Sequence, residues 1–312
     1  MVEWAWWAGI VAKNPEMADR ILLTIDVDTV SQDMRNGARL WRQGVASSRG
    51  QVAKADSIGK EIGTYWAEGL IDRVMRSVVP MFDPSKEELF ELKEQVLAWD
   101  TTNQYVSPHS VNEGHYGEIR ALMLGSLAAR LGDDTELETQ ISYLANKPDA
   151  ETPGEPSFVF AKTLRAVRAW YLKENDQVLA ELENSQMFTN DVCAVCSRVH
   201  AQTINRFMRA EILFSCGEYD DALKWYNSLW DGNLTWGSDH LGTTYLRTAA
   251  VHEERGESEL AAQYYAKFID LWKESDPKYQ GLVDQARQRE QQIRTGQFAE
   301  DDQLIIPVQP SN

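Results

Sequence analysis

The chain has 312 residues, and its 43% hydrophobic and 10% aromatic content supplies enough apolar material to argue against wholesale disorder. The formal net charge of −17 argues against nucleic-acid binding, because that needs clustered lysines and arginines. No apolar run approaches the roughly 18 residues of a membrane span, and Glu3 stands where an export signal carries positive charge. We therefore expect no nucleic-acid partner, membrane span or signal peptide, while the compartment stays undetermined.

Residues 1–105 carry divergent copies of a helix–turn–helix unit. An opening hairpin is expected to turn near Asn14–Pro15. A second turn is expected at Gly50, with the small residue Ala55 five positions later, and a third at Asp83–Ser85. Glycine favours such turns because it tolerates the left-handed conformation that ends a helix.

The run "ILLTIDVDTV" (residues 21–30) resembles the nucleophile loop of haloacid-dehalogenase-type phosphatases, with Asp26 as nucleophile and Asp28 as acid. That chemistry needs a strand in a parallel sheet and later lysine and aspartate loops, and the sequence supplies neither. The run instead continues an amphipathic pattern that begins at Pro15. We therefore expect a helix here and no phosphatase site.

Residues 106–275 carry the clearer repeats. In "GEYDDALKWY" (217–226) and "GESELAAQYY" (256–265), Gly, Glu, Ala and Tyr coincide at the same four offsets. We expect Ala222 and Ala261 to let the two helices of each hairpin approach closely, and the tyrosines four residues later to fill the space between hairpins. Weaker copies turn at Gly132 and at Asn175, with Ala180 five residues after the latter.

Successive turns at 132, 175, 217 and 256 are 43, 42 and 39 residues apart. Residues 276–298 are apolar on one side only, as a capping helix should be, and residues 299–312 form an apolar tail. The sequence therefore predicts an all-α fold of about seven stacked helical hairpins, in a single array over residues 1–298.

The units at 203–236 and 242–275 resemble tetratricopeptide repeats at the small, glycine, alanine and aromatic positions: Ala210, Gly217, Ala222 and Tyr226, then Ala249, Gly256, Ala261 and Tyr265. The C-terminal half also resembles repeat regions attached to bacterial multidomain signalling proteins. The period is near 40 rather than 34, and Arg206 and Tyr245 replace the family's early tryptophan. The resemblance implies a right-handed α-solenoid with a concave groove for a peptide or protein, lined by Phe207, Glu211, Phe214, Leu246, Ala250 and Glu253.

The stretch "DVCAVCSRVH" (191–200) raises the question of a metal or haem site. Ser197 stands where haem attachment needs a histidine. A four-ligand zinc site would need Cys193, Cys196, His200 and a fourth ligand, and Cys216 is the only remaining cysteine. A continuous helix over 197–216 would hold Cys216 roughly 30 Å from Cys196, too far for one zinc ion. We therefore predict no metal and no cofactor. Cys193 and Cys196 are either a disulfide or redox pair or two small buried residues, and we favour the second interpretation.

We expect a non-catalytic interaction or scaffold module for a protein or peptide partner. The sequence has no zincin-like histidine pair, glycine-rich phosphate loop or nucleophile elbow, and so predicts no enzyme. The alternative is a structural subunit that assembles end to end with copies of itself. The tryptophans at positions 4, 6 and 7 favour that alternative.

The tail generates the first test, because Leu304, Ile305, Ile306 and Val308 follow an acidic segment and its prolines exclude a helix. Exposed aliphatic clusters promote association, so we predict that these residues dock on their own chain or on a second copy. Deletion of residues 303–312 should lower the melting temperature at unchanged mass, or should abolish oligomers in light scattering. A truncated chain with unchanged stability and mass would contradict docking.

Overall fold

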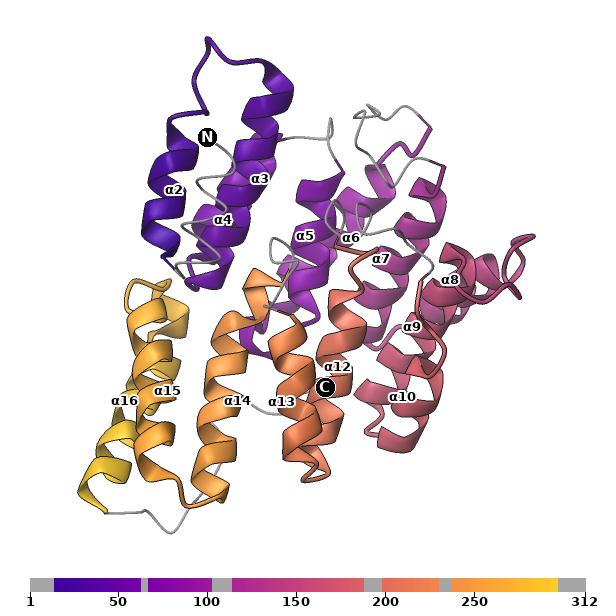
Figure 1. The fold of residues 1–312 in the computed structure, drawn as a ribbon. Coiled ribbons are helices and arrows are strands. Elements are labelled where there is room, and N and C mark those ends of the chain that lie inside the picture. The colour runs from indigo at the N-terminus through magenta and orange to yellow at the C-terminus, as the bar shows by residue number, and fades with distance from the viewer. Residues whose placement is uncertain (1–13, 63–66, 103–113, 188–197, 230–236, 297–312) are drawn as a thin grey trace. The chain divides into compact units, whose positions relative to one another are not determined.

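A computed structural model describes residues 14–62, 67–102, 114–187, 198–229 and 237–296 (Figure 1). Those residues form fourteen α-helices and three short 3-10 helices, with no strand in the described ranges. The all-helical prediction is confirmed to that extent. The chain divides into two compact units: unit 1 contains residues 14–61 and 217–296, and unit 2 contains residues 62–216.

Unit 2 is built around α7 and α9, which pack on each other and on α8. Its helices are α5 (Glu68–Ser77), α6 (Lys86–Ala98), α7 (Tyr116–Leu131), α8 (Asp134–Ala145), α9 (Pro156–Tyr171), α10 (Asn175–Leu182) and α12 (Thr203–Ser215), with the 3-10 turn η3 (Pro80–Phe82) after α5. A Cβ atom at Gly125 would lie 2.5 Å from Leu164 Cδ1, so glycine is what allows α7 and α9 to approach this closely. Both helices bury most of their residues, and side chains from both belong to one hydrophobic core.

Unit 1 joins the two ends of the described chain. Its helices are α2 (Pro15–Leu23), α3 (Gln32–Ser48), α4 (Val52–Ile62), α13 (Tyr219–Ser228), α14 (Leu241–Glu254), α15 (Ser258–Trp272) and α16 (Gln280–Thr295), with 3-10 turns η4 (Ser238–His240) and η5 (Pro277–Tyr279). The helix α15 packs on both α14 and α16, as Figure 1 shows. On α16 only Val283, Ala286 and Ile293 are buried, so the helix predicted over 276–298 exists with its polar side exposed.

Asp19 ties the first three helices of unit 1 together. Its Oδ1 accepts a hydrogen bond from Arg42 Nε of α3 at 3.0 Å, and its Oδ2 accepts one from Lys54 Nζ of α4 at 2.7 Å. Burial alone would raise the pKa of Asp19, but the two cations outweigh it and hold the pKa below its usual value. The carboxylate is therefore ionised where it bridges the helices.

Of the seven predicted turns, the four at glycines are confirmed, and residues 83–85 separate η3 from α6 as predicted. The helix expected before the turn at Asn14–Pro15 lies outside the described residues. The glycines at 50, 132, 217 and 256 all adopt positive φ, between 69° and 79°. Five residues after each glycine the chain buries an inward-facing side chain, at Ala55, Leu137, Ala222 and Ala261. The repeat thus has a fixed register, from a left-handed turn to a buried position five residues later.

The predicted turn at Asn175 is wrong by two residues. Lys173 is the residue with positive φ (63°), and Asn175 is the first residue of α10. The residue five after Lys173 is the buried Val178, while Ala180 is exposed. The apolar spacing of Val178 and Leu182 sets the register here, and it outweighs the local preference of asparagine for left-handed turns.

Two helices predicted as continuous are interrupted. The helix from Pro15 ends at Leu23, and turns occupy residues 24–30. The helix predicted over 197–216 begins only at Thr203, after Gln202 with a φ of 49°. The unbroken helix from which a 30 Å separation was inferred is therefore absent, since α12 has thirteen residues and rises only about 20 Å. Cys193 and Cys196 lie outside the described residues, so the separation itself stays a prediction.

Residues 48–53 contact residues 272–276, and we call this contact the closing junction. The indole Nε1 of Trp272 donates to the Ser48 carbonyl at 2.8 Å, and the Asp276 amide donates to the Gly50 carbonyl at 3.0 Å. The Ala53 amide donates to Asp276 Oδ2 at 2.8 Å. A linear stack in which each hairpin contacts only its neighbours does not require such contacts.

The closing junction depends on Gly50. A Cβ atom there would lie 2.7 Å from Ser275 Cβ and 2.8 Å from Trp272 Cε3, whereas Gly256 has a similar φ and nothing within 4 Å. Both Gly→Ala variants should lose about 1–2 kcal/mol to the left-handed backbone. Gly50→Ala should lose about 1–3 kcal/mol more from overpacking. Urea unfolding checks this, and equal losses in the two variants would show that the junction is loose.

Candidate functional site

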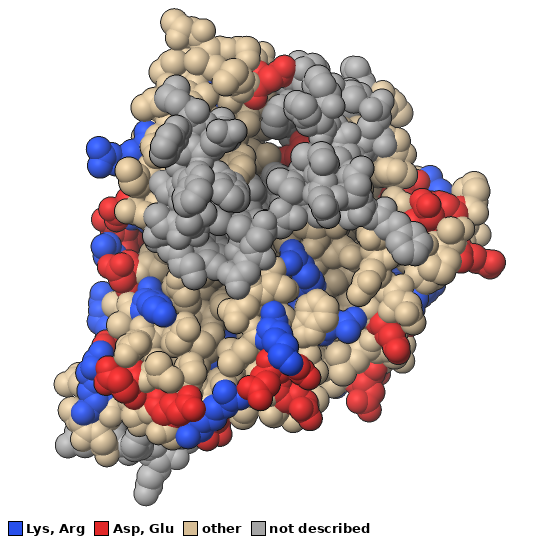
Figure 2. Space-filling view, viewed as in Figure 1, with Lys and Arg blue, Asp and Glu red and all other residues tan. Residues whose placement is uncertain are grey.

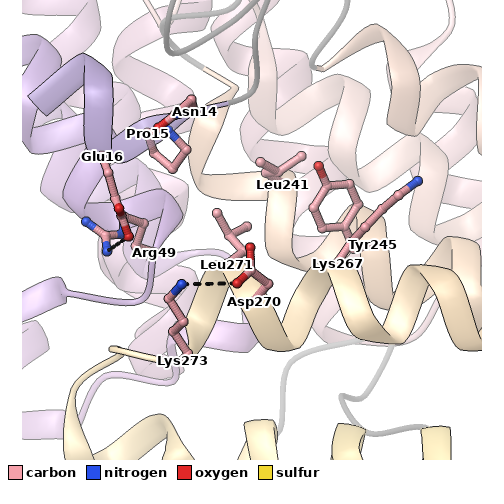
Figure 3. A pocket seen from close by; sticks show the side chains of 10 residues that line it. All are labelled: Asn14, Pro15, Glu16, Arg49, Leu241, Tyr245, Lys267, Asp270, Leu271 and Lys273. Carbon is pink, nitrogen blue, oxygen red and sulfur yellow. Dashed lines mark hydrogen bonds and ion pairs between the residues drawn. The ribbon is translucent and has the colours of Figure 1, made fainter.

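A pocket of about 440 Å³ lies in unit 1 (Figure 3). It is lined by residues from the start of α2, the end of α3, and α14, α15 and the residue after α15: Asn14, Pro15, Glu16, Arg49, Leu241, Tyr245, Lys267, Asp270, Leu271 and Lys273. Arg49 precedes Gly50 in the chain, so the closing junction positions one wall of the pocket against the other. Its volume falls in the range of small-ligand pockets.

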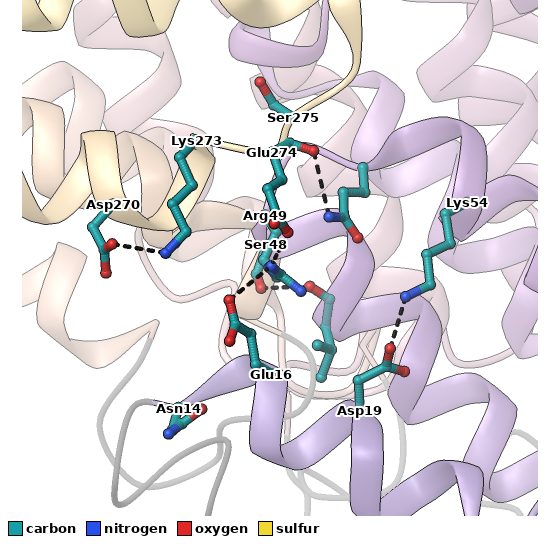
Figure 4. Close-up of polar contacts among 12 residues, drawn as sticks. Asn14, Glu16, Asp19, Ser48, Arg49, Lys54, Asp270, Lys273, Glu274 and Ser275 are labelled. Atoms are coloured by element: carbon teal, nitrogen blue, oxygen red, sulfur yellow. Dashed lines mark hydrogen bonds and ion pairs between the residues drawn. The ribbon is translucent and has the colours of Figure 1, made fainter.

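The acidic groups around the pocket are already bound by cations (Figure 4). Arg49 Nη2 lies 3.2 Å from Glu16 Oε1 and 2.6 Å from Glu274 Oε2. Lys273 Nζ donates to Asp270 Oδ1 at 3.1 Å, and this hydrogen bond raises the pKa of Lys273. A ligand entering the pocket therefore meets carboxylates whose charge is largely compensated.

Two donors in the pocket have no acceptor among the described residues. Lys267 lies with Nζ 3.9 Å from the ring centroid of Tyr264, without a carboxylate partner in that part of the chain. The Tyr245 ring also contacts Tyr264, at a centroid distance of 6.2 Å, and its hydroxyl makes no hydrogen bond within the described ranges. Burial, with a smaller contribution from Tyr264, raises the pKa of Tyr245 to about 12, so the hydroxyl remains a donor at neutral pH.

These groups can bind a ligand, but they do not form an acid–base pair or an activated nucleophile. The described residues also contain no group of three or more histidine, cysteine, aspartate or glutamate side chains that could hold a metal ion. What the lining offers a ligand is hydrogen-bond donors and apolar surface.

A second feature of unit 1 is a set of four exposed large hydrophobic side chains on the α2–α3 hairpin. Met17, Leu23, Val27 and Met34 are between 42% and 54% exposed. The other large hydrophobic side chains that are exposed in the described ranges are Phe90 and Leu97, seven residues apart on α6, and the separate residues Tyr143, Leu172 and Leu260. We call Met17, Leu23, Val27 and Met34 the α2–α3 surface.

The two aspartates of the phosphatase-like run bind arginines of α3. Asp26 Oδ2 lies 2.9 Å from Arg42 Nη1, and Asp28 Oδ1 lies 2.7 Å from Arg35 Nη1. The segment that carries them consists of turns rather than a strand. Both carboxylates thus hold the hairpin in place.

The residues expected to line a concave groove are largely buried. Phe207, Glu211, Phe214, Leu246 and Ala250 are at most 7% exposed. Glu253 is half-buried, and its carboxylate lies 2.7 Å from Arg289 Nε and accepts a hydrogen bond from the Tyr265 hydroxyl at 2.5 Å. The structure therefore offers a partner little surface at these six positions, and the groove stays a prediction.

Buried charges in unit 2 form a separate cluster. Asp72 pairs with Arg76 at 3.1 Å and with Arg198, and all three side chains are at most 4% exposed. The charges of Asp72, Arg76 and Arg198 therefore face one another rather than solvent. His200 follows Arg198 by two residues. Burial, together with the charge of His115, lowers the pKa of His200 to about 4, so this side chain is neutral at pH 7.

Several predicted residues lie outside the described ranges: Cys193, Cys196, Leu304, Ile305, Ile306 and Val308, together with the tryptophans at the start of the chain. The predictions for them stay predictions. Cys216 is described, and it is an exposed free thiol at the end of α12.

Sequence analysis missed the pocket, although it held one signal. Tyr245 was recognised as a departure from the tetratricopeptide pattern, at a position where a tryptophan is expected. In the structure this residue is one of those that line the pocket. Arg49 and Lys267 gave no such signal, because they are brought together only by folding.

Comparison with known proteins gives no match: no family model, no curated protein and no solved structure is detectably similar to the chain. The resemblance to tetratricopeptide repeats therefore rests on the repeat motif alone. Within the described residues, none of the helices combines the length and the apolar character needed to cross a membrane.

The raised pKa of Tyr245 can be measured directly. At pH 10 a solvated tyrosine is about half ionised, whereas Tyr245, with a pKa of about 12, should remain almost wholly protonated. NMR of the protein with ¹³Cζ-labelled tyrosine, assigned with Tyr245→Phe, reports the ionisation. Tyrosine amide in the same buffer is the control, and equal ionisation of the two would mean that the hydroxyl is fully solvated.

Proposed function

We propose that the protein is a non-catalytic helical-repeat module that binds a partner protein through the α2–α3 surface. The observation that carries the proposal is the gathering of Met17, Leu23, Val27 and Met34 on one hairpin. Apolar side chains exposed singly are ordinary, but a group of them marks an interaction surface.

The surroundings of the α2–α3 surface fit a protein interface. Leu22, Ile25 and Ala38 form a small core beneath it, so the hairpin is supported rather than free. Charged residues such as Asp28 and Arg35 lie beside the apolar ones in sequence and pair with each other. An apolar centre with a polar rim is the usual anatomy of a protein interface.

The repeated register supports the wider class. Both units place a left-handed turn five residues before a buried side chain, and the regular elements of the described residues are all helices. A tetratricopeptide-like solenoid of about seven hairpins remains part of the proposal. Solenoid proteins bind partners along extended surfaces, which agrees with an interaction or scaffold role.

The alternative is self-assembly through the same surface. An apolar surface at one hairpin can meet a complementary surface elsewhere on a second copy, and such a heterologous contact builds open chains. The observation that favours this is again the exposure of the four α2–α3 residues.

Photo-crosslinking tests the proposal. With p-benzoylphenylalanine at Val27, irradiation in the source cells should give one discrete adduct, to be identified by mass spectrometry and reproduced with the purified partner. The same group at Leu172, an isolated exposed residue of unit 2, is the matched control. Leu23→Ser with Met34→Ser should abolish the adduct while changing stability little, because both residues are exposed.

The outcomes separate the two candidates. An adduct of twice the chain mass that contains only its own peptides, together with concentration-dependent light scattering, would establish self-assembly instead. Equal adducts from positions 27 and 172, or none from either, would contradict a role for the α2–α3 surface.

A further inference from the structure

In the pocket of unit 1 the carboxylates are paired with cations, whereas two of the hydrogen-bond donors have no acceptor in the described part of the chain. Its carboxylates, Glu16 and Asp270, are bound by Arg49 and Lys273. Its cation Lys267 and the hydroxyl of Tyr245 have no acceptor in the described part of the chain. What the pocket lacks is therefore an acceptor, and an anionic one completes it best.

We propose that this pocket binds a carboxylate that carries a short aliphatic chain. The site goes beyond the proposed protein interface, because it uses none of the α2–α3 surface residues. The carboxylate would accept hydrogen bonds from Lys267 and Tyr245, and charge-assisted hydrogen bonds of this kind are the strong ones.

The apolar residues of the lining indicate which kind of group should follow the carboxylate in the ligand. Figure 3 shows Leu241 and Leu271 between the Asn14–Glu16 side of the pocket and the Tyr245–Lys267 side. Pro15 adds apolar surface on the far side. A chain of a few methylene groups that starts at the carboxylate would therefore run across the two leucines, where its burial is favourable.

The net charge of −17 does not prevent anion binding here, and Figure 2 shows lysines and arginines interspersed with the acidic residues on one face. At physiological ionic strength the screening length is about 8 Å, so distant carboxylates are largely screened. The three nearby carboxylates are paired with Arg49 and Lys273, and Lys267 brings the number of cations to three as well. The local charge is therefore balanced, and it does not oppose an anion.

The same chemistry can come from a free organic acid or from a glutamate beside a leucine in a peptide. Hexanoate represents the first source, and acetyl-Leu-Glu-amide represents the second. Hexanamide has the shape of hexanoate without its charge, and so isolates the contribution of the carboxylate.

Titration calorimetry with the whole chain at pH 7 tests the proposal. Hexanoate should bind with a Kd on the order of 1 mM, as expected for a ligand of this size. Hexanamide should bind about ten-fold more weakly or not at all, since charge-assisted hydrogen bonds are about twice as strong as neutral ones. Lys267→Met should weaken hexanoate about ten-fold, and Tyr245→Phe should weaken it several-fold, because each removes one donor.

Lys278→Met is the matched control, since Lys278 is also an exposed lysine of unit 1 that lies over a tyrosine ring, at 4.9 Å from Tyr279, but outside the pocket. It should leave the Kd of hexanoate unchanged, and the melting temperatures of all variants show that each is folded. If the peptide binds and hexanoate does not, and Lys267→Met weakens the peptide about ten-fold, the pocket is a carboxylate site whose ligand is a protein.

Equal binding of hexanoate and hexanamide, the same loss in Lys278→Met, or no saturable binding of either carboxylate would overturn the proposal. None of these results changes crosslinking from Val27. Failure of the pocket and failure of the protein interface are therefore distinguishable.

Discussion

The contact of Trp272 and Ser275 with Gly50 is the constraint on which unit 1 depends. It brings residues 48–53 against residues 272–276, and its hydrogen bonds use backbone groups of Ser48, Gly50 and Asp276. Trp272 is fully buried between Phe268 and Tyr279, so the indole is fixed when it meets Ser48. Position 50 favours glycine for two reasons. Its φ of 69° lies in the left-handed region, and a Cβ atom there would be too close to the indole of Trp272.

Both proposed binding features of unit 1 depend on this contact. Arg49 lies between Glu16 of α2 and Glu274 just after α15, so the pocket exists only while the two chain segments are joined. Asp19 of α2 joins the α2–α3 hairpin to α4, and Asp26, in the turn between the two helices, binds Arg42 of α3. An interface that recognises a partner and a pocket that recognises a carboxylate would thus share one scaffold, with separate residues.

The sequence was most informative where structure is local. Left-handed glycines and the buried residue five positions later follow from backbone sterics and helix geometry, and Ala222 and Ala261 occupy the expected buried positions. At Lys173 the inference failed, because the spacing of buried side chains outweighed a single-residue preference. The junction and the pocket could not be inferred, since they join residues more than two hundred positions apart and no local pattern encodes such a pairing.

One measurement tests the closing junction most directly. The indole Nε1 of Trp272 lies 2.8 Å from the Ser48 carbonyl, and the ring meets the position that a Cβ atom at Gly50 would occupy. NMR should therefore show strong nuclear Overhauser effects from the ring protons of Trp272 to the α-protons of Gly50, with the indole signals assigned by Trp272→Phe. The closing junction is contradicted if these effects are absent and the indole Nε1 proton of Trp272 exchanges freely with solvent. Neither the junction nor the pocket built on it would then exist.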